Sequence, residues 1–143
     1  MREIVKHPGA VVILPITDDN YVYMVRQYRK PVEEELIELP AGKLEQDEDP
    51  IETAKRELKE ELSLEALEWT RLTFTYSSPG FTDEKMYFFL AKGLKESYGE
   101  ADEDEIIEPE KLRLDELYNK ISQGEIKDGK TVLALMYYKN FYA

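Results

Sequence analysis

One short stretch of the sequence contains three closely spaced glutamates, Glu57, Glu60 and Glu61. The stretch from about Pro50 to Leu62 has the spacing of an amphipathic helix, with apolar residues at Ile51, Ala54, Leu58 and Leu62. Because successive helical residues are turned by roughly 100°, Glu57 and Glu61 fall on one edge of the apolar stripe, and Glu60 lies just beyond them. Two carboxylates four residues apart repel each other by about 0.2–0.5 kcal/mol. A hard cation such as Mg²⁺ or Mn²⁺ would offset this repulsion, since it prefers oxygen ligands and bridges carboxylates to phosphates.

The charges of this helix also have an alternative interpretation, a solvated face of surface ion pairs. Lys55, Arg56 and Lys59 lie among the glutamates, and Glu52 stands four residues before Arg56. Oppositely charged residues at this spacing pair on the surface of ordinary helices. The charge pattern alone therefore favours a solvated face, and a functional interpretation depends on the residues around the helix.

The composition excludes several other kinds of site. The chain has 143 residues, no cysteine and one histidine, His7, which we expect to be structural. This excludes disulfides and thiolate catalysis, and it argues against multi-histidine metal sites and serine–histidine catalysis. The net charge of −12 argues against nucleic-acid and anionic-membrane partners. The N-terminal residues lack a signal-peptide pattern and no run of 18 apolar residues occurs, so a cytoplasmic protein is expected.

The order of the predicted elements indicates one domain over residues 1–143 with an α/β (α+β) fold. Short apolar or β-branched runs predict strands at 10–16, 21–25, 35–40, 67–76 and 85–91 and around Leu112. Turn-forming residues at 17–20 predict a hairpin between the first two strands. Helices are predicted at Pro50–Leu62, Leu114–Ser122 and Thr131–Tyr142. Strands interleaved with helices suggest a mixed β-sheet sandwiched between α-helices.

The residues around the glutamate-bearing helix resemble the motif of the Nudix hydrolase family. From Gly42 the chain continues with five residues, Glu48, seven residues and then Arg56-Glu57-Leu58-Lys59-Glu60-Glu61-Leu62-Ser63-Leu64. This resembles the Nudix box at every fixed position except Ser63, where the family has glycine. Ser63 is expected to end the helix with a positive φ, which costs serine about 1 kcal/mol relative to glycine.

The resemblance to the Nudix box implies the Nudix fold, a bound divalent cation and a role for each matching residue. The implied metal ligands for Mg²⁺ or Mn²⁺ are Glu57, Glu61, Glu60 and the carbonyl oxygen of Ala41. Arg56 is expected to orient these carboxylates, and Arg56 and Glu60 are also expected to assist catalysis. Glu48 is expected to pair with Arg56 or to reach a metal through water.

A second resemblance, to the ADP-ribose pyrophosphatases of this family, concerns the loop Tyr76–Glu84. Pro79 stands sixteen residues beyond Ser63, where that subfamily carries its marker proline. By this resemblance Ser78, Pro79 and Glu84 are expected to contact the substrate. The alternative is an ordinary hairpin turn, for which a Ser-Pro-Gly sequence is common.

The same subfamily resemblance implies three further site residues. Arg29, in the sequence Arg26-Gln27-Tyr28-Arg29, is expected to bind a substrate phosphate, with an ordinary strand-end charge as its alternative. The acidic segment Gly99–Glu105 resembles a loop that covers the site, with Glu103 as the catalytic base and Glu105 as another metal ligand. A solvated charge run is the alternative for this segment.

Together the two resemblances imply metal-dependent hydrolysis of the diphosphate bond of a nucleoside diphosphate sugar. The first candidate is ADP-ribose, cleaved to AMP and ribose 5-phosphate, and the nearest alternative is another such substrate, for example GDP-mannose. A non-catalytic Nudix-like module that senses a nucleotide is a further alternative, as is a purely structural protein. Because related enzymes build the site from two subunits, a homodimer is expected, with no nucleic-acid or membrane partner.

Overall fold

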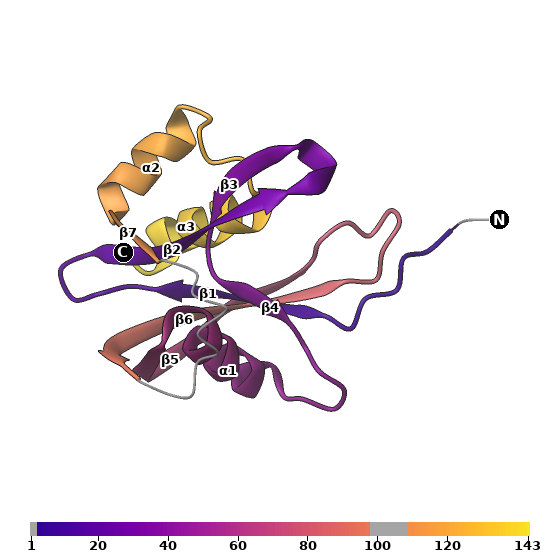
Figure 1. Cartoon of the computed structure of the whole chain (residues 1–143), viewed down its shortest axis with the longest axis horizontal. Coiled ribbons are helices and arrows are strands. Elements are labelled where there is room, and N and C mark those ends of the chain that lie inside the picture. The colour runs from indigo at the N-terminus through magenta and orange to yellow at the C-terminus, as the bar shows by residue number, and fades with distance from the viewer. Residues whose placement is uncertain (1–2, 98–108) are drawn as a thin grey trace.

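A computed structural model describes residues 3–97 and 109–143 of the chain. Within these residues, seven strands form two sheets, with helices packed around them (Figure 1). The larger sheet has the order β4-β1-β6-β5, formed by Ala41–Lys43, Ala10–Pro15, Lys85–Glu96 and Leu64–Tyr76. The smaller sheet has the order β3-β2-β7, formed by Glu34–Glu38, Tyr21–Arg29 and Glu110–Arg113. The helices are α1 (Pro50–Leu62), α2 (Leu114–Ser122), α3 (Gly129–Phe141) and the short 3-10 helix η1 (Lys30–Val32).

Strand β1 lies inside the larger sheet and separates the two halves of the core. It pairs with β4 in antiparallel and with β6 in parallel orientation, and all six of its residues are buried. Because successive strand residues point to opposite faces, Val11 belongs to one buried cluster with Leu58 of α1, whereas Val12 belongs to another with Leu135 of α3. The larger sheet is therefore sandwiched between α1 and α3, as predicted (Figure 1).

Helix α1 spans the residues predicted for it, and both of its ends have a local cause. The side chain of Asp49 accepts a hydrogen bond from the Ile51 backbone N–H at 3.3 Å, and Pro50 occupies the first turn. At the other end Ser63 has φ 53° and ψ 41°, a left-handed conformation that glycine adopts most easily. Its backbone N–H donates to the Lys59 carbonyl oxygen at 2.9 Å. The helix thus ends at the position where the Nudix box has a glycine.

The predicted hairpin between the first two strands forms only at its turn, and the strand pairing expected beyond the turn is wrong. Among the described residues, β1 and β2 lie in different sheets and share only the antiparallel bridge between Ile16 and Val22. The turn itself forms, since the Thr17 backbone N–H donates to the Tyr21 carbonyl oxygen at 2.8 Å. Beyond this turn the strands diverge, because both edges of β1 are paired with β4 and β6. A wholly apolar strand is typical of the middle of a sheet, and this signal outweighs the closeness of the two strands in sequence.

Several other elements differ from their predicted bounds by a few residues. β5 begins at Leu64 and β6 continues to Glu96, because these two residues still pair with each other at the far end of the ladder. β4 lies in a segment predicted to be a loop, and α3 begins at Gly129, two residues before the predicted start. No helix in the described parts of the chain is long and apolar enough to cross a membrane.

Candidate active site

A cavity of about 390 Å³ opens where both sheets, the first turn of α3 and the N-terminal segment meet. The residues around it include His7, Arg29, Ala41, Gly42, Glu84 and Lys130. Three residues that were predicted as site residues from separate parts of the sequence, Arg29, Ala41 and Glu84, therefore border one cavity. The folding of both sheets is needed to bring them together, since they come from β2, β4 and the loop before β6.

Glu57 lies beside this cavity, against the backbone of Gly42. A β-carbon built on Gly42 would stand 2.1 Å from the Glu57 carboxyl carbon, so a larger residue at this position would displace the carboxylate. The Glu57 side chain is only 13% exposed. Burial raises the pKa of Glu57, and the neighbouring Arg56 offsets only part of this effect. The absence of a side chain at Gly42 thus leaves the space that the Glu57 carboxylate occupies.

Glu61 lies one helical turn beyond Glu57 and is largely enclosed. Burial, and secondly the charge of Glu57, raise the pKa of Glu61 to about 8. Its Oε2 atom is buried without a hydrogen-bond partner among the described residues. Leaving a buried polar group unpaired costs about 1–3 kcal/mol, so such atoms normally have a partner. A proton or an external cation would satisfy this oxygen.

Arg56 connects the other carboxylates of the motif. Its guanidinium donates to the two oxygens of Glu48, from Nε at 3.0 Å and from Nη2 at 2.9 Å. Its Nη1 donates to Glu57 at 3.0 Å and to Glu60 at 3.2 Å. The hydrogen bond from Arg56 lowers the pKa of Glu48 to about 2, so that this carboxylate stays ionised. Arg56 therefore holds three glutamates at once, including the Glu48 partner that the motif suggested.

Among the described residues, no three acidic or histidine side chains are grouped closely enough to hold a metal ion, and two of the predicted ligands contact Arg56. The guanidinium draws Glu57 and Glu60 toward itself, and Glu60 is 56% exposed. Glu103 and Glu105, predicted as base and metal ligand, lie outside the described residues. Arg56 contacts one oxygen each of the Glu57 and Glu60 carboxylates, so it can orient them without occupying both oxygens of either one.

Another wall of the cavity carries positive charge, from Arg29 and Lys130. Arg29 donates through Nε and Nη2 to the two carboxylate oxygens of Glu38, at 2.7 Å each. Lys130 Nζ donates to the same carboxylate at 2.7 Å and to Asp128 at 3.0 Å. The Glu38 side chain is only 1% exposed, whereas that of Arg29 is 45% exposed. The cations thus face the cavity, and the carboxylate that holds them lies behind.

The sequence prediction missed Glu38, Asp128 and Lys130. Glu38 did carry a signal, because it interrupts the apolar run Leu36–Leu39 and a charge buried in such a run needs a partner. Lys130 carried no comparable signal, since its buried partner Glu38 lies 92 positions earlier in the chain. Only the three-dimensional packing of α3 against the sheets reveals this contact.

The loop between β5 and β6 does not bring all three of its predicted substrate contacts to the cavity. Glu84 borders the cavity, and its carboxylate lies 3.1 Å from His7 Nε2. Pro79 instead lines a separate hollow of about 330 Å³. The Ser78 carbonyl oxygen accepts a hydrogen bond from the Phe81 backbone N–H at 3.1 Å, as in an ordinary turn. Of this loop, Glu84 is the predicted contact that is best placed to meet a ligand in the cavity.

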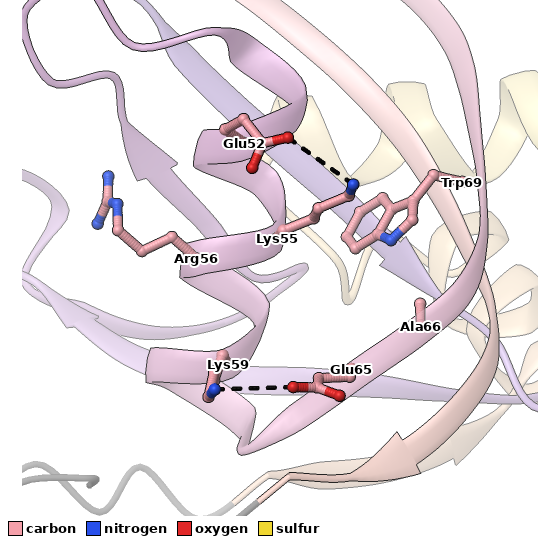
Figure 2. A pocket seen from close by; sticks show the side chains of 7 residues that line it. All are labelled: Glu52, Lys55, Arg56, Lys59, Glu65, Ala66 and Trp69. Carbon is pink, nitrogen blue, oxygen red and sulfur yellow. Dashed lines mark ion pairs between the residues drawn. The ribbon is translucent and has the colours of Figure 1, made fainter. Parts of the chain in front are cut away.

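The outer side of α1 forms a different hollow, of about 490 Å³, against β5 (Figure 2). Here Lys55 lies 3.8 Å from Glu52, and Lys59 lies 3.6 Å from Glu65. Arg56 points away from these two pairs (Figure 2). Glu52 therefore pairs with Lys55 rather than with Arg56, the partner that its spacing suggested. The interpretation as a solvated face therefore holds for this side of the helix, whereas Glu57 lies on another side, against Gly42.

Comparison with known proteins assigns the chain to a family. The model of the NUDIX domain matches residues 6–135, which is most of the chain. The chain belongs to the NUDIX domain family. This NUDIX assignment confirms the resemblance carried by residues 42–64, and NUDIX hydrolases generally use a divalent metal ion.

Several known proteins are similar to this NUDIX chain over most of its length. A protein named methanol dehydrogenase activator, from Bacillus methanolicus, is 49% identical over 138 residues, 95% of this chain and 75% of the relative. The ADP-ribose pyrophosphatase of Bacillus subtilis (strain 168) is 46% identical over 138 residues, with the same shares of both chains. The crystal structure of an ADP compounds hydrolase has a TM-score of 0.82 and 27% identity, covering 93% of this chain and 71% of that chain. The similarity thus extends from the motif to the whole fold.

Proposed function

We propose that this NUDIX protein hydrolyses the diphosphate bond of a nucleoside diphosphate sugar, with ADP-ribose as the first candidate. Water and ADP-ribose would give AMP and ribose 5-phosphate. The observation that carries the proposal is the contrast in charge around one cavity: Arg29 and Lys130 line it, and the Glu57 carboxylate packs against Gly42, another of its lining residues. A diphosphate bound together with cations needs both acidic and basic groups. The similarity to an ADP-ribose pyrophosphatase supports the choice of substrate.

A divalent cation fits the carboxylates beside the cavity, and we propose Mg²⁺ or Mn²⁺. The unpartnered Oε2 of Glu61 is an oxygen ligand of the kind that these hard cations prefer. Glu57 and Glu61 would be the main ligands, with Glu60 and the Ala41 carbonyl oxygen as further ones. When bound, the cation would neutralise the diphosphate and lower the pKa of the attacking water.

The chain's own side chains would bind and orient the substrate. Arg29 has five N–H donors, of which Glu38 accepts two, so three are left for a phosphate. Arg56 would keep the carboxylates in place. Loop contacts to the substrate are proposed for Ser78, Pro79 and Glu84. From the family resemblance, Glu103 would take the proton of the attacking water and Glu105 would be another metal ligand.

A substrate panel tests this proposal. The purified protein is incubated with Mg²⁺ or Mn²⁺ and with ADP-ribose, GDP-mannose and related diphosphates, and the products are separated by chromatography. Wild type is compared with Glu57→Gln and Glu61→Gln. Glu52→Gln is the matched control, since Glu52 is an exposed glutamate of the same helix that pairs with Lys55. AMP and ribose 5-phosphate are expected from wild type and from Glu52→Gln.

Each other outcome of the panel selects a different function. Equal turnover by all four proteins would remove the proposed metal site. Preference for GDP-mannose would keep the chemistry and change the substrate. Tight nucleotide binding without any turnover would favour a sensing module. No binding, and no effect of Mg²⁺ with nucleotide on the melting temperature, would favour a structural protein.

A second candidate function comes from the relative named methanol dehydrogenase activator, which is 49% identical to this chain. We propose it as an additional role that would use the same site. Adding the purified chain to a methanol dehydrogenase, with Mg²⁺ present, is expected to raise the rate of that enzyme if the role is shared. Glu61→Gln separates the two possibilities, because activation that persists in this variant does not depend on hydrolysis.

We also propose that the protein is a cytoplasmic homodimer. Ile4 and Phe81 are 65% and 57% exposed and line the same small hollow. They provide an apolar surface at the loop between β5 and β6. Apolar patches of this kind often form contacts between subunits. Light scattering in solution is expected to give the mass of two chains, and the mass of one chain would reject the dimer.

A further inference from the structure

Glu38 is the buried centre of a small ionic network at the cavity. Its carboxylate, 1% exposed at the end of β3, accepts two hydrogen bonds from Arg29 of β2 and one from Lys130 of α3, all at 2.7 Å. The three residues come from three different elements. One side chain therefore fixes the relative position of two cations that the sequence places far apart.

The three charged groups of this network differ in how far they lie below the protein surface. The Arg29 side chain is 45% exposed and that of Lys130 is 17% exposed, whereas the carboxylate between them is closed off from solvent. Burial by itself would raise the pKa of Glu38, but the hydrogen bonds from Arg29 and Lys130 more than offset this, so the pKa is lowered. The carboxylate is ionised at neutral pH. A ligand in the cavity thus meets the cations first.

The donors of the two cations are only partly used by their carboxylate partners. Glu38 accepts from Nε and Nη2 of Arg29, which prevents the planar guanidinium from rotating and leaves its other N–H groups to point elsewhere. Lys130 donates to Glu38 and to Asp128, which leaves one of its three N–H groups. Both cations can therefore bind a phosphate oxygen without leaving Glu38.

We propose that Glu38 is a positioning residue that holds Arg29 and Lys130 as a joined pair of phosphate-binding cations. The inference rests on the proposed function, since it assigns this pair to the diphosphate of the substrate. Glu38 itself would not touch the substrate. It would preset the direction of the donors, so that the cost of ordering two long side chains is met on folding and not on binding.

A purely stabilising ion pair is the competing explanation, and the chain offers a matched control for it. Arg26, on the same strand as Arg29, forms a similar two-point pair with Glu110, at 2.6 and 2.9 Å. Glu110 is 35% exposed, and neither Arg26 nor Glu110 borders the cavity. Loss of the Glu110 pair reports what removing an arginine–glutamate pair does to the fold without touching the proposed site.

The experiment compares Glu38→Gln, Glu110→Gln, Arg29→Ala and the double variant Glu38→Gln/Arg29→Ala. KM and kcat for ADP-ribose are measured with Mg²⁺, together with inhibition by AMP and the melting temperature of each protein. Glu38→Gln is expected to raise KM and to weaken AMP binding by about 10- to 100-fold, with a smaller change in kcat. Glu110→Gln is expected to leave KM and AMP binding close to wild type. The loss in the double variant is expected to be smaller than the sum of the two single losses, because Glu38 acts in part through Arg29 and in part through Lys130.

Three results would overturn the inference while leaving the proposed function intact. The first is a KM of Glu38→Gln that equals the KM of Glu110→Gln. The second is a fully additive loss of activity in the double variant. The third is a Glu38→Gln variant whose melting temperature falls while its KM and AMP binding stay unchanged. Absence of turnover by wild type would instead reject the proposed function. If Glu38→Gln does not fold, Lys130→Gln replaces it, since this variant keeps the pair of Glu38 with Arg29. Its KM is expected to rise, and an unchanged KM would reject the joined pair.

Discussion

Glu38 and Glu61 are two enclosed glutamates near the same cavity whose pKa values are shifted in opposite directions. Burial, with the charge of Glu57, raises the pKa of Glu61 to about 8. Burial acts in the same direction on Glu38, yet its pKa is lowered, because Arg29 and Lys130 donate hydrogen bonds to it. The difference lies in the neighbours, since one glutamate faces two cations of its own chain and the other faces a second glutamate.

This comparison shows how the same side chain can serve two purposes. A buried carboxylate that is paired with cations of its own chain needs no further partner and can act as a fixed support. A buried carboxylate beside another carboxylate lacks such a partner, and a proton or an external cation stabilises it. Glu61 is therefore the better candidate for metal binding, and Glu38 is the better candidate for positioning.

Replacement of Glu61 by glutamine removes the carboxylate that lacks a cationic partner, and it is expected to have the largest effect on activity. Glu61→Gln should lower kcat/KM for ADP-ribose by more than about 100-fold, because a lost metal ligand exceeds the usual cost of losing an outer partner of a ligand. The metal-free protein should be as stable as wild type or more so at pH 8, since the repulsion from Glu57 is removed. Steady-state kinetics and thermal melts check the two parts. Activity near that of wild type would show that Glu61 is not a ligand.

Crowding at Gly42 provides the next test, because it acts on Glu57 without changing any charge. Gly42→Ala places a β-carbon 2.1 Å from the position of the Glu57 carboxyl carbon, so this carboxylate must move. We expect kcat/KM to fall by about 10- to 100-fold, in the range seen when the support of a metal ligand is lost. Gly80→Ala is the control, since nothing lies within 4 Å of a β-carbon at that position. Equal activity of both variants would separate Gly42 from the site.

Addition of metal should act on Glu61 and not on Glu38. Millimolar Mg²⁺ is expected to raise the melting temperature of wild type by a few degrees, since a ligand that binds the native state stabilises it. The shift should vanish in Glu61→Gln and persist in Glu38→Gln. Differential scanning fluorimetry with and without Mg²⁺ measures it. The same shift in both variants would contradict the contrast between the two glutamates.

The pH dependence of stability should also distinguish the two carboxyl groups. The folded-state pKa of Glu61 is raised. Its contribution to the free energy of unfolding is therefore fully present below the ordinary pKa of 4.5 and is lost as the pH rises through about 8. The folded-state pKa of Glu38 is lowered. Its contribution to the free energy of unfolding is therefore fully present above the ordinary pKa of 4.5 and is lost as the pH falls through the lowered pKa. In metal-free buffer the melting temperature should therefore decline from mildly acidic to alkaline pH, and Glu61→Gln should remove much of this decline. An equal decline in wild type and Glu61→Gln would exclude Glu61 as its source.

The smallest expected effect comes from the C-terminal end of α1. There the backbone strain at Ser63 can be removed without altering Glu38 or Glu61. Ser63 has φ 53°, and Ser63→Gly should raise the free energy of unfolding by about 1 kcal/mol or less. The kinetic constants should stay close to wild type, because Ser63 supplies no ligand. Chemical denaturation and the ADP-ribose assay measure the two quantities. A change in kcat would show that this helix end controls the carboxylates.

The sequence predicted best those features that depend on local spacing. Helix α1 was placed correctly because Pro50 starts it and its apolar residues have helical spacing, and α2 was likewise correct. The surroundings of Glu57 could be anticipated from Gly42 and Arg56, which lie nearby in the chain. These features follow from contacts within about twenty residues.

Features that depend on the packing of distant elements could not be predicted in this way. The partners of β1 were wrong because adjacency in sequence favoured β2, whereas the sheet uses β4 and β6. The network of Glu38 was missed because Lys130 reaches it only when α3 packs against the sheets. Ser78 and Pro79 were predicted as substrate contacts through resemblance alone, and this stays a prediction, since neither lines the cavity that Glu84 borders. Local patterns carry no information about which distant side chains meet.

The parallel pairing of β1 with β6 affects how the chain can fold during its synthesis. β1 ends at Pro15, and its parallel partner β6 begins only at Lys85. A growing chain on the ribosome can pair one edge of β1 with β4, but the other edge of this apolar strand stays unpaired until β6 has been made. Contacts between distant segments form slowly, and unpaired apolar strands are prone to aggregate. This NUDIX domain should depend on rapid completion of translation, or on chaperones, more than a protein built from consecutive hairpins.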